Sequence, residues 1–514
     1  MSPALPNPAV PGFNPDPSVC RVGDDYYLAC SSFEYLPGVP LYHSRDLATW
    51  EPIGHVVTRP EQLALRDIPT LGGVWAPTIR FHDGRFWIVV TDAMGRGNLI
   101  FTAEDPAGPW SDGMAMEGVD GIDPDLAWDA DGTAYVTFSG LILGGERMGE
   151  HLGIQQVRVD LETGRALEAP RSMWSGTGLK FPEAPHIYEL DGTWYLMIAE
   201  GGTERGHGVS IARGPAPDGP FEGCPRNPVL TARSTSWPVQ NAGHGDLVRR
   251  PDGGWAMVLL GMRARGMTQA FSPMGRETFI TSLEWVDGWP VVDPLDAIGG
   301  REPVEEIADL GGPELGVEWL SIRTPAAEWS SLDERPGTLV VHGDGSTMDD
   351  LRPHFVARRQ QHEAAVLSAR VDPGDGVAGL SLRIDEHHHY DIEAGGGVAR
   401  ARARVGPLCQ TWERPIDSGP VTLSIDIRPT GGVAGFAVAP DVVHLGVDEG
   451  AGVVELAALD GRYVSAETAA SFTGRVVGVY AVEGAAAFDE IRYHGRDGAP
   501  APAAAQLSMS GESA

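Results

Sequence analysis

The chain has 514 residues, with 38 Lys or Arg and 71 Asp or Glu, so its formal net charge is −33 and its pI is near 4.7. This length allows two domains of ordinary size. Such acidity argues against a nucleic acid or an anionic membrane surface as partner. No stretch approaches the roughly 20 apolar residues that cross a bilayer, and the opening residues, MSPALPNPAVPGF, lack the pattern of a signal peptide.

Five segments share a turn centred on an aspartate and followed by an apolar, aromatic run. The aspartates are Asp24, Asp83, Asp131, Asp191 and Asp252, and they are separated by 59, 48, 60 and 61 residues. Runs such as FWIVV and WYLMI after Asp-Gly turns predict β-hairpins, and repeats of this period indicate propellers or solenoids. Units of about four strands arranged radially form a β-propeller. We therefore predict a propeller with five blades.

A second repeat lies eight residues before each turn aspartate. The residues at these positions, called the ring residues below, are Asp16, Trp75, Asp123, Glu183 and His244. Because equivalent positions at the starts of the innermost strands surround the propeller axis, we predict that they share one site. A purely structural ring is the alternative. Three acids in one cavity would, however, repel one another and resist burial, which favours a functional role.

The repeat ends after Trp289. We assign residues 1–300 to the propeller and residues 301–320, REPVEEIADLGGPELGVEWL, to a linker. Segments such as AAVLSARVDP, VAGLSLRID and AAFDEIRYHG predict a β-sandwich over residues 321–496, so the whole chain is predicted to be all-β. Residues 497–514 are rich in Ala, Pro and Ser and are predicted to be disordered.

The cysteines and a histidine tract show no sign of metal chemistry. Cys20, Cys30, Cys224 and Cys409 have no metal-ligand spacing and are too few for a disulfide framework, so we expect reduced thiols in a cytoplasmic protein. The tract at residues 387–389 lies in an alternating strand pattern that directs neighbours to opposite faces. No spaced Cys, His or carboxylate set accompanies it, so we expect no metal there.

Paired carboxylates are the groups that hydrolyse glycosidic bonds: one protonates the leaving oxygen, and another attacks the sugar or activates a water. The three ring acids lie in the segments GFNPDPSV, DGIDPDLAW and KFPEAPHIY. Each acid is next to, or close to, a proline, which fixes the backbone. These surroundings are consistent with rigidly aimed carboxylates.

Several motifs resemble, in order, those of the family-43 glycoside hydrolases, and most closely the β-xylosidase and α-L-arabinofuranosidase branch. They are GFNPDPSV, GGVWAPTIRFHDGRF, GIDPDL, PEAPHIY, AEGGT, AGHGDLV and MGRETFI, within residues 7–295. The resemblance continues through HFVARRQQH, FTGRVVGVYA and FDEIRYHG, which look like the concanavalin-like β-sandwich of that branch. It implies a five-bladed catalytic propeller followed by this sandwich, and an enzyme that inverts anomeric configuration.

The resemblance also implies a role for each acid. Asp16 would be the general base, Glu183 the general acid, and Asp123 the residue that orients Glu183 and tunes its pKa. These roles agree with electrostatics, because a carboxylate near Glu183 disfavours its ionisation and keeps it protonated. Inversion needs the base and the acid about 6.5 to 9.5 Å apart, which leaves room for a water.

The remaining site residues also follow from the resemblance. Trp75 and Phe33 would wall the sugar, with core packing as the alternative for each. Arg276 would contact the sugar hydroxyls, with a surface or salt-bridge role as its alternative, and His244 would lie beneath the sugar. The matching histidine in the family often lies near a bound cation or water in the axial channel. A single histidine does not make a calcium site. We therefore expect no required cofactor and leave open a structural calcium ion in the axis, near His244.

Three departures from the family pattern lie close to the expected site. The stretch SGLILGGERMGEHLG looks short, and TGLKFPEAPH replaces a frequent EGPH form. In FTGRVVGVYA, Arg475 and Val476 stand where the resemblance leads us to expect a small residue and an aromatic one that walls the pocket. The depth of the pocket therefore stays open at this point.

The first functional hypothesis is an exo-acting hydrolase that releases xylose from the non-reducing ends of xylo-oligosaccharides. An α-L-arabinofuranosidase acting on arabinose side chains is the second, and one enzyme can have both activities. A catalytically inactive carbohydrate-binding propeller is the third, although the three acids argue against it. The expected partner is a xylo-oligosaccharide or arabinoxylan-oligosaccharide, and self-association into a homo-oligomer is compatible with all three hypotheses.

Overall fold

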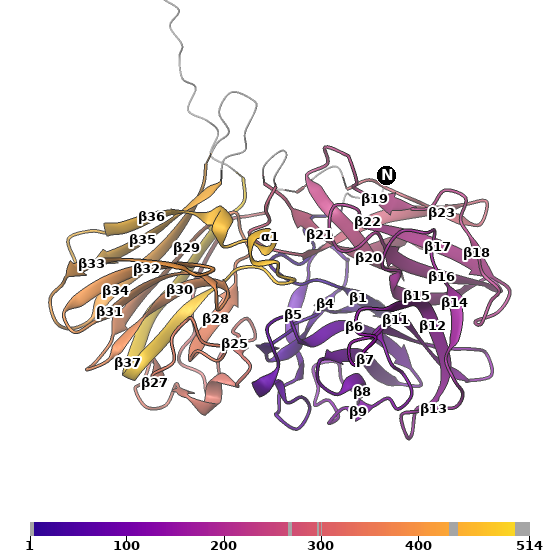
Figure 1. Cartoon of the computed structure of the whole chain (residues 1–514), viewed down its shortest axis with the longest axis horizontal. Coiled ribbons are helices and arrows are strands. Elements are labelled where there is room, and N and C mark those ends of the chain that lie inside the picture. The colour runs from indigo at the N-terminus through magenta and orange to yellow at the C-terminus, as the bar shows by residue number, and fades with distance from the viewer. Residues whose placement is uncertain (1–4, 266–269, 296–297, 300, 431–439, 499–514) are drawn as a thin grey trace, which may run out of the picture.

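The computed structural model describes residues 5–265, 270–295, 298–299, 301–430 and 440–498. These residues form two β domains that lie side by side, a propeller from the N-terminal half and a sandwich from the C-terminal half (Figure 1). The predicted fold class is thus confirmed. No helix within the described ranges is long and apolar enough to cross a membrane.

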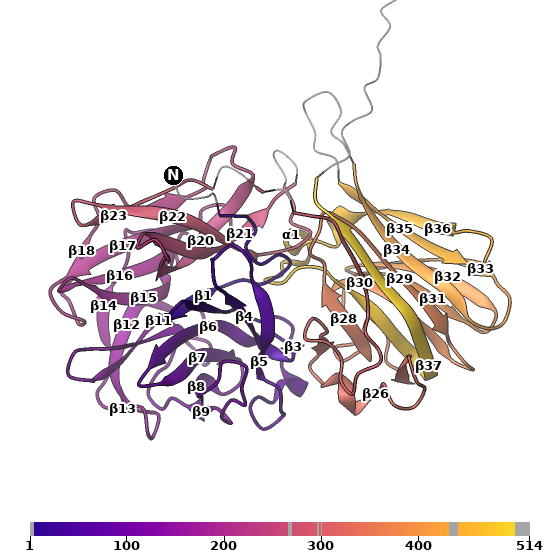
Figure 2. The same ribbon diagram turned by 180° about the vertical axis from the view of Figure 1, so that it is seen from behind.

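Each blade of the propeller is an antiparallel sheet whose first strand lies nearest the axis (Figure 2). Blade one contains β1 (Ser18–Val22), β2 (Asp25–Ala29), β4 (Gly38–Ser44) and β5 (Glu51–Val57). Blade two contains β6 (Gly73–His82), β7 (Arg85–Ala93), β8 (Gly97–Ala103) and β9 (Met114–Ala115). Blade three contains β10 (Ile122–Trp128), β11 (Ala134–Leu141), β12 (His151–Asp160) and β13 (Arg165–Ala166), with β14 (Arg171–Trp174) also paired to β12.

Blade four contains β15 (Glu183–Leu190), β16 (Thr193–Glu200), β17 (Gly208–Gly214) and β18 (Glu222–Gly223), with β19 (Leu230–Thr231) also paired to β17. Blade five contains β20 (Val239–Arg249), β21 (Trp255–Arg263), β22 (Glu277–Val286) and β23 (Trp289–Val292). The innermost strands β1, β6, β10, β15 and β20 contact one another around the axis. The described residues therefore confirm the five predicted blades.

The turn aspartates join the first and second strands of the blades, as predicted. In blades two and four the registers His82↔Arg85 and Leu190↔Thr193 leave two-residue turns. Asp83 and Asp191 have φ values of 50° and 51° in these turns, and the glycine that follows each is also left-handed. Two consecutive positive-φ residues match the right-handed twist of the strands, which is why Asp-Gly is favoured there.

The ring residues lie where the innermost strands are irregular. The pairing register shifts between Trp75 and Thr78, between Ile122 and Asp125, and between Glu183 and His186. At every ring position, the ring residue or its successor has a positive φ; these residues are Asp16, Ala76, Asp123, Ala184 and His244. A bulge of this kind redirects a side chain, and left-handed non-glycine residues cost about 1 to 3 kcal/mol each. Tertiary contacts must therefore hold them.

Beneath the ring, one guanidinium joins all five blades. Arg80 Nη1 lies 2.9 Å from Asp246 Oδ2 and donates to Ser18 Oγ at 3.2 Å. Its Nη2 lies 2.6 Å from Asp125 Oδ1 and 3.0 Å from His186 Nδ1. The five residues come from β1, β6, β10, β15 and β20. They form a hydrogen-bonded layer across the axis, which we call the Arg80 hub.

The hub keeps two fully buried carboxylates ionised. Burial would raise the pKa of Asp125 and of Asp246, but the charge of Arg80, together with His186 and neighbouring hydrogen bonds, outweighs it, and both pKa values lie below the usual range. Tyr188 adds a hydrogen bond to Asp246 Oδ1 at 2.6 Å. Because these pKa values are lowered on folding, the stabilisation is complete above the ordinary carboxyl pKa of about 3.9. It is lost as the pH falls towards the lowered values.

The N-terminal segment closes the propeller on blade five. Val10 pairs with Thr278 through two backbone hydrogen bonds of 3.2 Å. The Asn7 amide donates to the Ile280 carbonyl and accepts from its N–H, both at 2.8 Å. Residues from the two ends of the propeller sequence thus complete one sheet edge, which fixes Asp16 relative to blade five.

The sandwich is built around one long strand, β37 (Val476–Arg496). β37 pairs with β24 (Val304–Ile307), β27 (Leu339–Asp344), β28 (Phe355–Arg359), β29 (Ala364–Asp372) and β30 (Val377–Asp385). From β30 the sheet continues through β31 (His388–Gly395), β32 (Val398–Val405) and β33 (Leu408–Pro415). From β29 it continues through β34 (Val421–Pro429), β35 (Asp441–Asp448) and β36 (Val454–Asp460), and β26 (Ser330–Ser331) pairs with β27.

Four short helical segments also occur in the described part of the chain. They are η1 (Leu65–Asp67), η2 (Ala326–Glu328), η3 (Gly461–Tyr463) and α1 (Ala466–Ala469). β25 (Ser321–Ile322) leaves the sandwich and pairs with β3 (Tyr35–Leu36) of the propeller. The segment predicted as a linker, residues 301–320, contains β24, so part of it is a strand of the sandwich. The reason is that the C-terminal half of the long β37 offers β24 a free edge.

The remaining predictions concern the tail, the thiols and the histidine tract. Asp497 is ordered and pairs with Arg263 at 2.9 Å, while residues 499–514 of the predicted tail lie outside the described residues. All four cysteines are free thiols. His389 is buried between Asp391 and Asp349, at 2.8 and 3.0 Å, so it serves as an ion-pair partner in the sandwich.

Replacing Arg80 with Met should destabilise the propeller strongly. The Arg80→Met variant would leave Asp125 and Asp246 buried without a cation, a change that typically costs about 3 to 5 kcal/mol. Differential scanning calorimetry should show a lower midpoint for the propeller transition. Arg85→Met, on the exposed edge of β7, is the matched control and should leave the midpoint nearly unchanged. Equal midpoints for the two variants would contradict the role of the hub.

Candidate active site

The ring residues converge at one end of the propeller axis, above the Arg80 hub. His244 Nδ1 lies 3.5 Å from Asp16 Oδ1, which joins blades five and one. The N–H of Ala184, next to Glu183, donates to Asp123 Oδ2 at 3.0 Å, which joins blades four and three. The charges of Asp123 and Asp16 both act on Glu183, and Trp75 is linked to Asp16 through Phe472 and Arg276, so the structure brings the five predicted positions together.

Asp16 is held as an ionised carboxylate. It is only 5% exposed. It accepts hydrogen bonds from Ser31 Oγ at 2.6 Å and from Arg276 Nη1 at 3.0 Å. Burial would raise the pKa of Asp16, but Arg276, His244 and the Ser31 hydrogen bond outweigh it and lower the pKa below the usual value. This carboxylate can accept a proton at neutral pH.

The pKa values of Glu183 and Asp123 are shifted in the opposite direction, upwards. Burial raises the pKa of Glu183, and the negative charges of Asp123 and Asp16 raise it further. Burial and the charge of Asp16 also raise the pKa of Asp123. The Glu183 side chain keeps 24% of its surface exposed, so it can still reach a ligand. This pair can hold and deliver a proton at neutral pH.

The two carboxyl environments divide acid from base. A carboxylate with a lowered pKa and a carboxyl with a raised pKa in one site are the arrangement required for general acid and general base catalysis. Burial is the largest contribution to the raised pKa of Glu183. The sequence suggested only the neighbouring charge, because the depth of a side chain depends on the assembled propeller.

Three aromatic residues stand beside the carboxyl groups. Trp75 is half-buried, and its Nε1 donates to the Leu71 carbonyl at 2.7 Å. Phe472, from the sandwich, meets Trp75 edge to face with ring centroids 5.9 Å apart and approaches Phe33 at 6.3 Å. Phe33 is only 1% exposed and has almost no surface for a ligand, so the aromatic surface of the site comes from Trp75 of the propeller and Phe472 of the sandwich. The sequence reasoning did not identify Phe472.

Arg475 and Val476 do not remove the aromatic wall, because Phe472 supplies it from three residues earlier. Arg475 is fully buried inside the sandwich, where it pairs with Asp441 and donates to the Val464 carbonyl. Val476 begins β37 and packs in the core. The segment FTGRVVGVYA thus keeps an aromatic residue at the site and turns into the sandwich immediately after it.

Arg276 links the base, the aromatic wall and blade four. Its Nη1 contacts Asp16 and donates to Thr203 Oγ1 at 3.2 Å, and its Nε donates to the Phe472 carbonyl at 3.1 Å. The guanidinium lies over the Phe472 and Phe33 rings, 5.1 and 5.7 Å from their centroids. Thr203 belongs to the AEGGT motif, which was noted for its family resemblance without a role for this hydroxyl.

His244 lies at the floor of the site, between Asp16 and the hub. Burial lowers the pKa of His244 to about 3, so its ring is neutral. No group of three or more His, Cys, Asp or Glu residues suited to a metal occurs in the described ranges. The axial carboxylates Asp125 and Asp246 are already bound to the Arg80 guanidinium. These residues do not fit a divalent cation, and the axial calcium stays a prediction without a ligand set.

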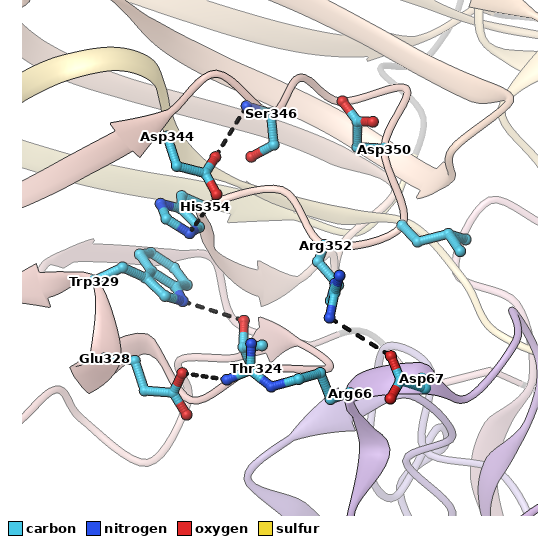
Figure 3. Close-up of a pocket in the computed structure, with 11 residues that line it drawn as sticks. Arg66, Asp67, Thr324, Glu328, Trp329, Asp344, Ser346, Asp350, Arg352 and His354 are labelled. Carbon is cyan, nitrogen blue, oxygen red and sulfur yellow. Dashed lines mark hydrogen bonds and ion pairs between the residues drawn. The ribbon is translucent and has the colours of Figure 1, made fainter.

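A cavity of about 480 Å³ lies between η1 of the propeller and the sandwich (Figure 3). Two ion pairs cross it: Arg66 to Glu328 at 2.6 Å and Arg352 to Asp67 at 3.6 Å. None of the ring residues lines it. The cavity therefore belongs to the domain interface and is separate from the acid–base site.

Comparison with known families assigns both domains. Residues 5–290 match the description of glycosyl hydrolases family 43. The chain belongs to glycoside hydrolase family 43. Residues 309–494 match the beta xylosidase C-terminal concanavalin A-like domain, which agrees with the predicted sandwich. The chain is thus a glycoside hydrolase whose catalytic propeller is followed by a concanavalin-like domain.

Its relatives span both domains. A non-reducing end alpha-L-arabinofuranosidase of Bacteroides ovatus is 37% identical, covering 92% of this chain and 90% of the relative. A xylosidase/arabinosidase of Butyrivibrio fibrisolvens is 44% identical and covers 78% and 82% of the two chains. The crystal structure of a xylan beta-1,4-xylosidase from Bacillus halodurans is similar with a TM-score of 0.84, 29% identity and coverage of 95% and 99%.

Removal of the Asp123 charge should lower the pKa of Glu183. In the Asp123→Asn variant the repulsion from Asp123 is gone, while burial and the charge of Asp16 persist, so the pKa should fall but stay above its ordinary value. Carbon-13 NMR titration of side-chain carboxyl groups can measure it, with Glu183→Gln identifying the signal. Asp24→Asn, in the exposed turn of blade one, should leave the signal unchanged. A Glu183 pKa that stays the same or rises in Asp123→Asn would refute this electrostatic coupling.

Proposed function

We propose that this family-43 enzyme is an exo-acting, inverting glycosidase that releases xylose from the non-reducing ends of β-1,4-xylo-oligosaccharides. The observation that carries the proposal is the opposite ionisation of two carboxyl groups in one ring, Asp16 with a lowered pKa and Glu183 with a raised one. Inverting glycosidases need one ionised and one protonated carboxyl group at the same pH. Asp16 is then the base and Glu183 the acid.

The reaction is a single displacement. Asp16 removes a proton from a water molecule as that water attacks the anomeric carbon. Glu183 gives its proton to the glycosidic oxygen as the bond between that oxygen and the anomeric carbon breaks. The attack comes from the face opposite the leaving group, so the configuration inverts. Asp123 holds the backbone N–H of Ala184 and raises the pKa of Glu183, which orients the acid and keeps it protonated.

The walls of the site support a sugar substrate. Aromatic faces offer large apolar surfaces against which a sugar ring can pack. Trp75 and Phe472 meet edge to face, and the Arg276 guanidinium that contacts Asp16 lies over the Phe472 ring. Arg276 supplies donors for sugar hydroxyls in addition to its bond with Asp16. We propose that Trp75, Arg276 and His244 bind the sugar and that the buried Phe33 supports Phe472 through its ring contact.

The second candidate is an α-L-arabinofuranosidase. Its support is the arabinofuranosidase of Bacteroides ovatus, which is similar over nine tenths of the chain. The relative from Butyrivibrio fibrisolvens has a name that includes both activities. We therefore propose that a xylo-oligosaccharide or an arabinoxylan-oligosaccharide is the substrate, that both pentosides are hydrolysed to some extent, and that no cofactor takes part. The reduced thiols support a cytoplasmic enzyme, and a homo-oligomer is compatible with this function.

The purified protein should release nitrophenol from nitrophenyl β-D-xylopyranoside and, more slowly, from nitrophenyl α-L-arabinofuranoside. Glu183→Ala should lower kcat/KM for xylobiose by about 10²-fold or more, because the sugar leaving group requires protonation. Glu189→Ala, an exposed glutamate on the same strand β15, should retain activity. A wild-type protein inactive on both nitrophenyl glycosides would favour the non-catalytic alternative, and an active Glu183→Ala variant would remove Glu183 as the acid.

The stereochemical course tests the role of Asp16. Proton NMR of a fresh reaction with a β-xyloside should show α-xylose as the first product, before mutarotation. Asp16→Asn should abolish its formation, because the amide cannot take a proton from water. If β-xylose appears first, the enzyme retains configuration, and Asp16 would then act as a nucleophile.

A further inference from the structure

One histidine lies beside the proposed acid and has no role in the reaction as described so far. His151 is the first residue of β12, in the stretch SGLILGGERMGEHLG that departs from the family pattern. Its side chain is 13% exposed, and its Nε2 lies 4.0 Å from Glu183 Oε1. It comes from blade three, whereas Glu183 begins the innermost strand of blade four.

The hydrogen bonds around His151 fix its tautomer. The N–H of Gly153 donates to His151 Nδ1 at 3.1 Å, so Nδ1 carries no hydrogen and the neutral ring is protonated at Nε2. Nε2 lies 2.9 Å from Ser139 Oγ, and Ser139 Oγ in turn donates to the Pro182 carbonyl at 3.2 Å. Every donor in this chain meets one acceptor. In the free enzyme the Nε2–H therefore donates to Ser139 Oγ, and Glu183 Oε1 lies 4.0 Å from the same nitrogen.

The ring stays neutral at the pH where the acid works. Burial lowers the pKa of His151 below its ordinary value. A neutral donor can orient a carboxyl group without adding a positive charge, which would promote loss of its proton. This distinguishes His151 from an arginine or lysine in the same place, because a permanent cation there would lower the pKa of Glu183.

We propose that His151 is a positioning residue that directs the acidic proton of Glu183 to Oε2. The proposal requires the Nε2–H to turn from Ser139 Oγ to Oε1 when substrate binds. A proton on Oε1 would then point at another hydrogen, whereas a proton on Oε2 leaves Oε1 free to accept. When Glu183 has given its proton to the leaving group, the same Nε2–H stabilises the new carboxylate. The distance of 4.0 Å is too long for a hydrogen bond in the free enzyme, and such contacts often shorten in the substrate complex. This inference rests on Glu183 being the general acid.

A merely structural role for His151 makes a different prediction. His151 could act only through Ser139, which holds the carbonyl of Pro182, the residue before Glu183. Loss of that anchor would displace the backbone next to Glu183 and slow the hydrolysis of every substrate. If only the orientation of the acidic proton were lost, hydrolysis would slow only for substrates whose leaving group needs that proton. The two roles can therefore be separated by the leaving group.

The experiment compares two aryl glycosides of the pentose that the wild type cleaves faster. The 2,4-dinitrophenyl group leaves without protonation, whereas the phenyl group needs the acid. His151→Leu should lower kcat/KM for the phenyl glycoside by about ten- to a hundredfold. Its kcat/KM for the dinitrophenyl glycoside should stay within about twofold of the wild-type value. His151→Gln, whose amide nitrogen can take the place of Nε2, should recover most of the activity on the phenyl glycoside.

Three controls keep the outcome unambiguous. Ser139→Ala breaks the link to Pro182 but leaves His151, and it should show no dependence on the leaving group. His43→Leu removes another imidazole paired with a carboxylate, that of Asp25 at 2.7 Å in blade one, and should retain activity on both glycosides. If His151→Leu fails to fold, His151→Asn replaces it, because the shorter amide cannot reach Oε1 and should lose the phenyl activity that His151→Gln keeps.

Several results would overturn the inference. Equal loss on both glycosides, no loss on either, or a leaving-group-dependent loss in Ser139→Ala would each remove the orienting role of His151 while leaving Glu183 as the acid. A wild-type protein that hydrolyses no pentoside would instead contradict the proposed function, and this inference with it. An active wild type with unaffected His151 variants distinguishes the two failures.

Discussion

The buried guanidinium of Arg80 is the interaction on which the rest of the propeller depends. It contacts one residue from each of the other four innermost strands, and it balances the two axial carboxylates Asp125 and Asp246. The ring lies directly above it, on bulges with left-handed residues that each cost about 1 to 3 kcal/mol. Strands tied together at the axis can hold these bulges in place, and the bulges direct the ring side chains to a common point.

The position of the positive charges explains why some buried carboxyl groups are ionised and others hold a proton. In the hub Arg80 forms ion pairs with both Asp125 and Asp246, so these two carboxylates stay ionised and have a structural role. In the ring the guanidinium of Arg276 lies against Asp16 and is held there by its hydrogen bonds to the Phe472 carbonyl and to Thr203. Burial and the charge of Asp16 raise the pKa values of Glu183 and Asp123, Asp123 raises that of Glu183 further, and Arg276 offsets these effects only in part. The overall charge of −33 contributes little, because exposed charges beyond about 10 Å are screened.

The blades and the ring could be predicted from the sequence because local rules fix them. An Asp-Gly turn and the strand before it have set lengths, so the eight-residue spacing from Asp83 to Trp75, or from Asp191 to Glu183, survives in the fold. Phe472 could not be predicted, since it reaches the site from the second domain and stands three residues before the positions where the resemblance places an aromatic residue. His151 was also missed, because only the pairing of two blades brings it to Glu183. The linker prediction was partly wrong because a free edge of β37 recruits β24.

The sandwich is part of the catalytic unit through Arg276. This one side chain donates to Asp16 of blade one and to the carbonyl of Phe472, and its guanidinium lies over the ring of that phenylalanine. The position of the second domain therefore influences both the wall of the site and the ionisation of the base. Ion pairs that lie outside the site, such as Arg66 to Glu328, join the two domains at their interface. A change that loosens the two domains would act on Asp16 without touching it, because Arg276 would lose the acceptor and the ring that position its charge.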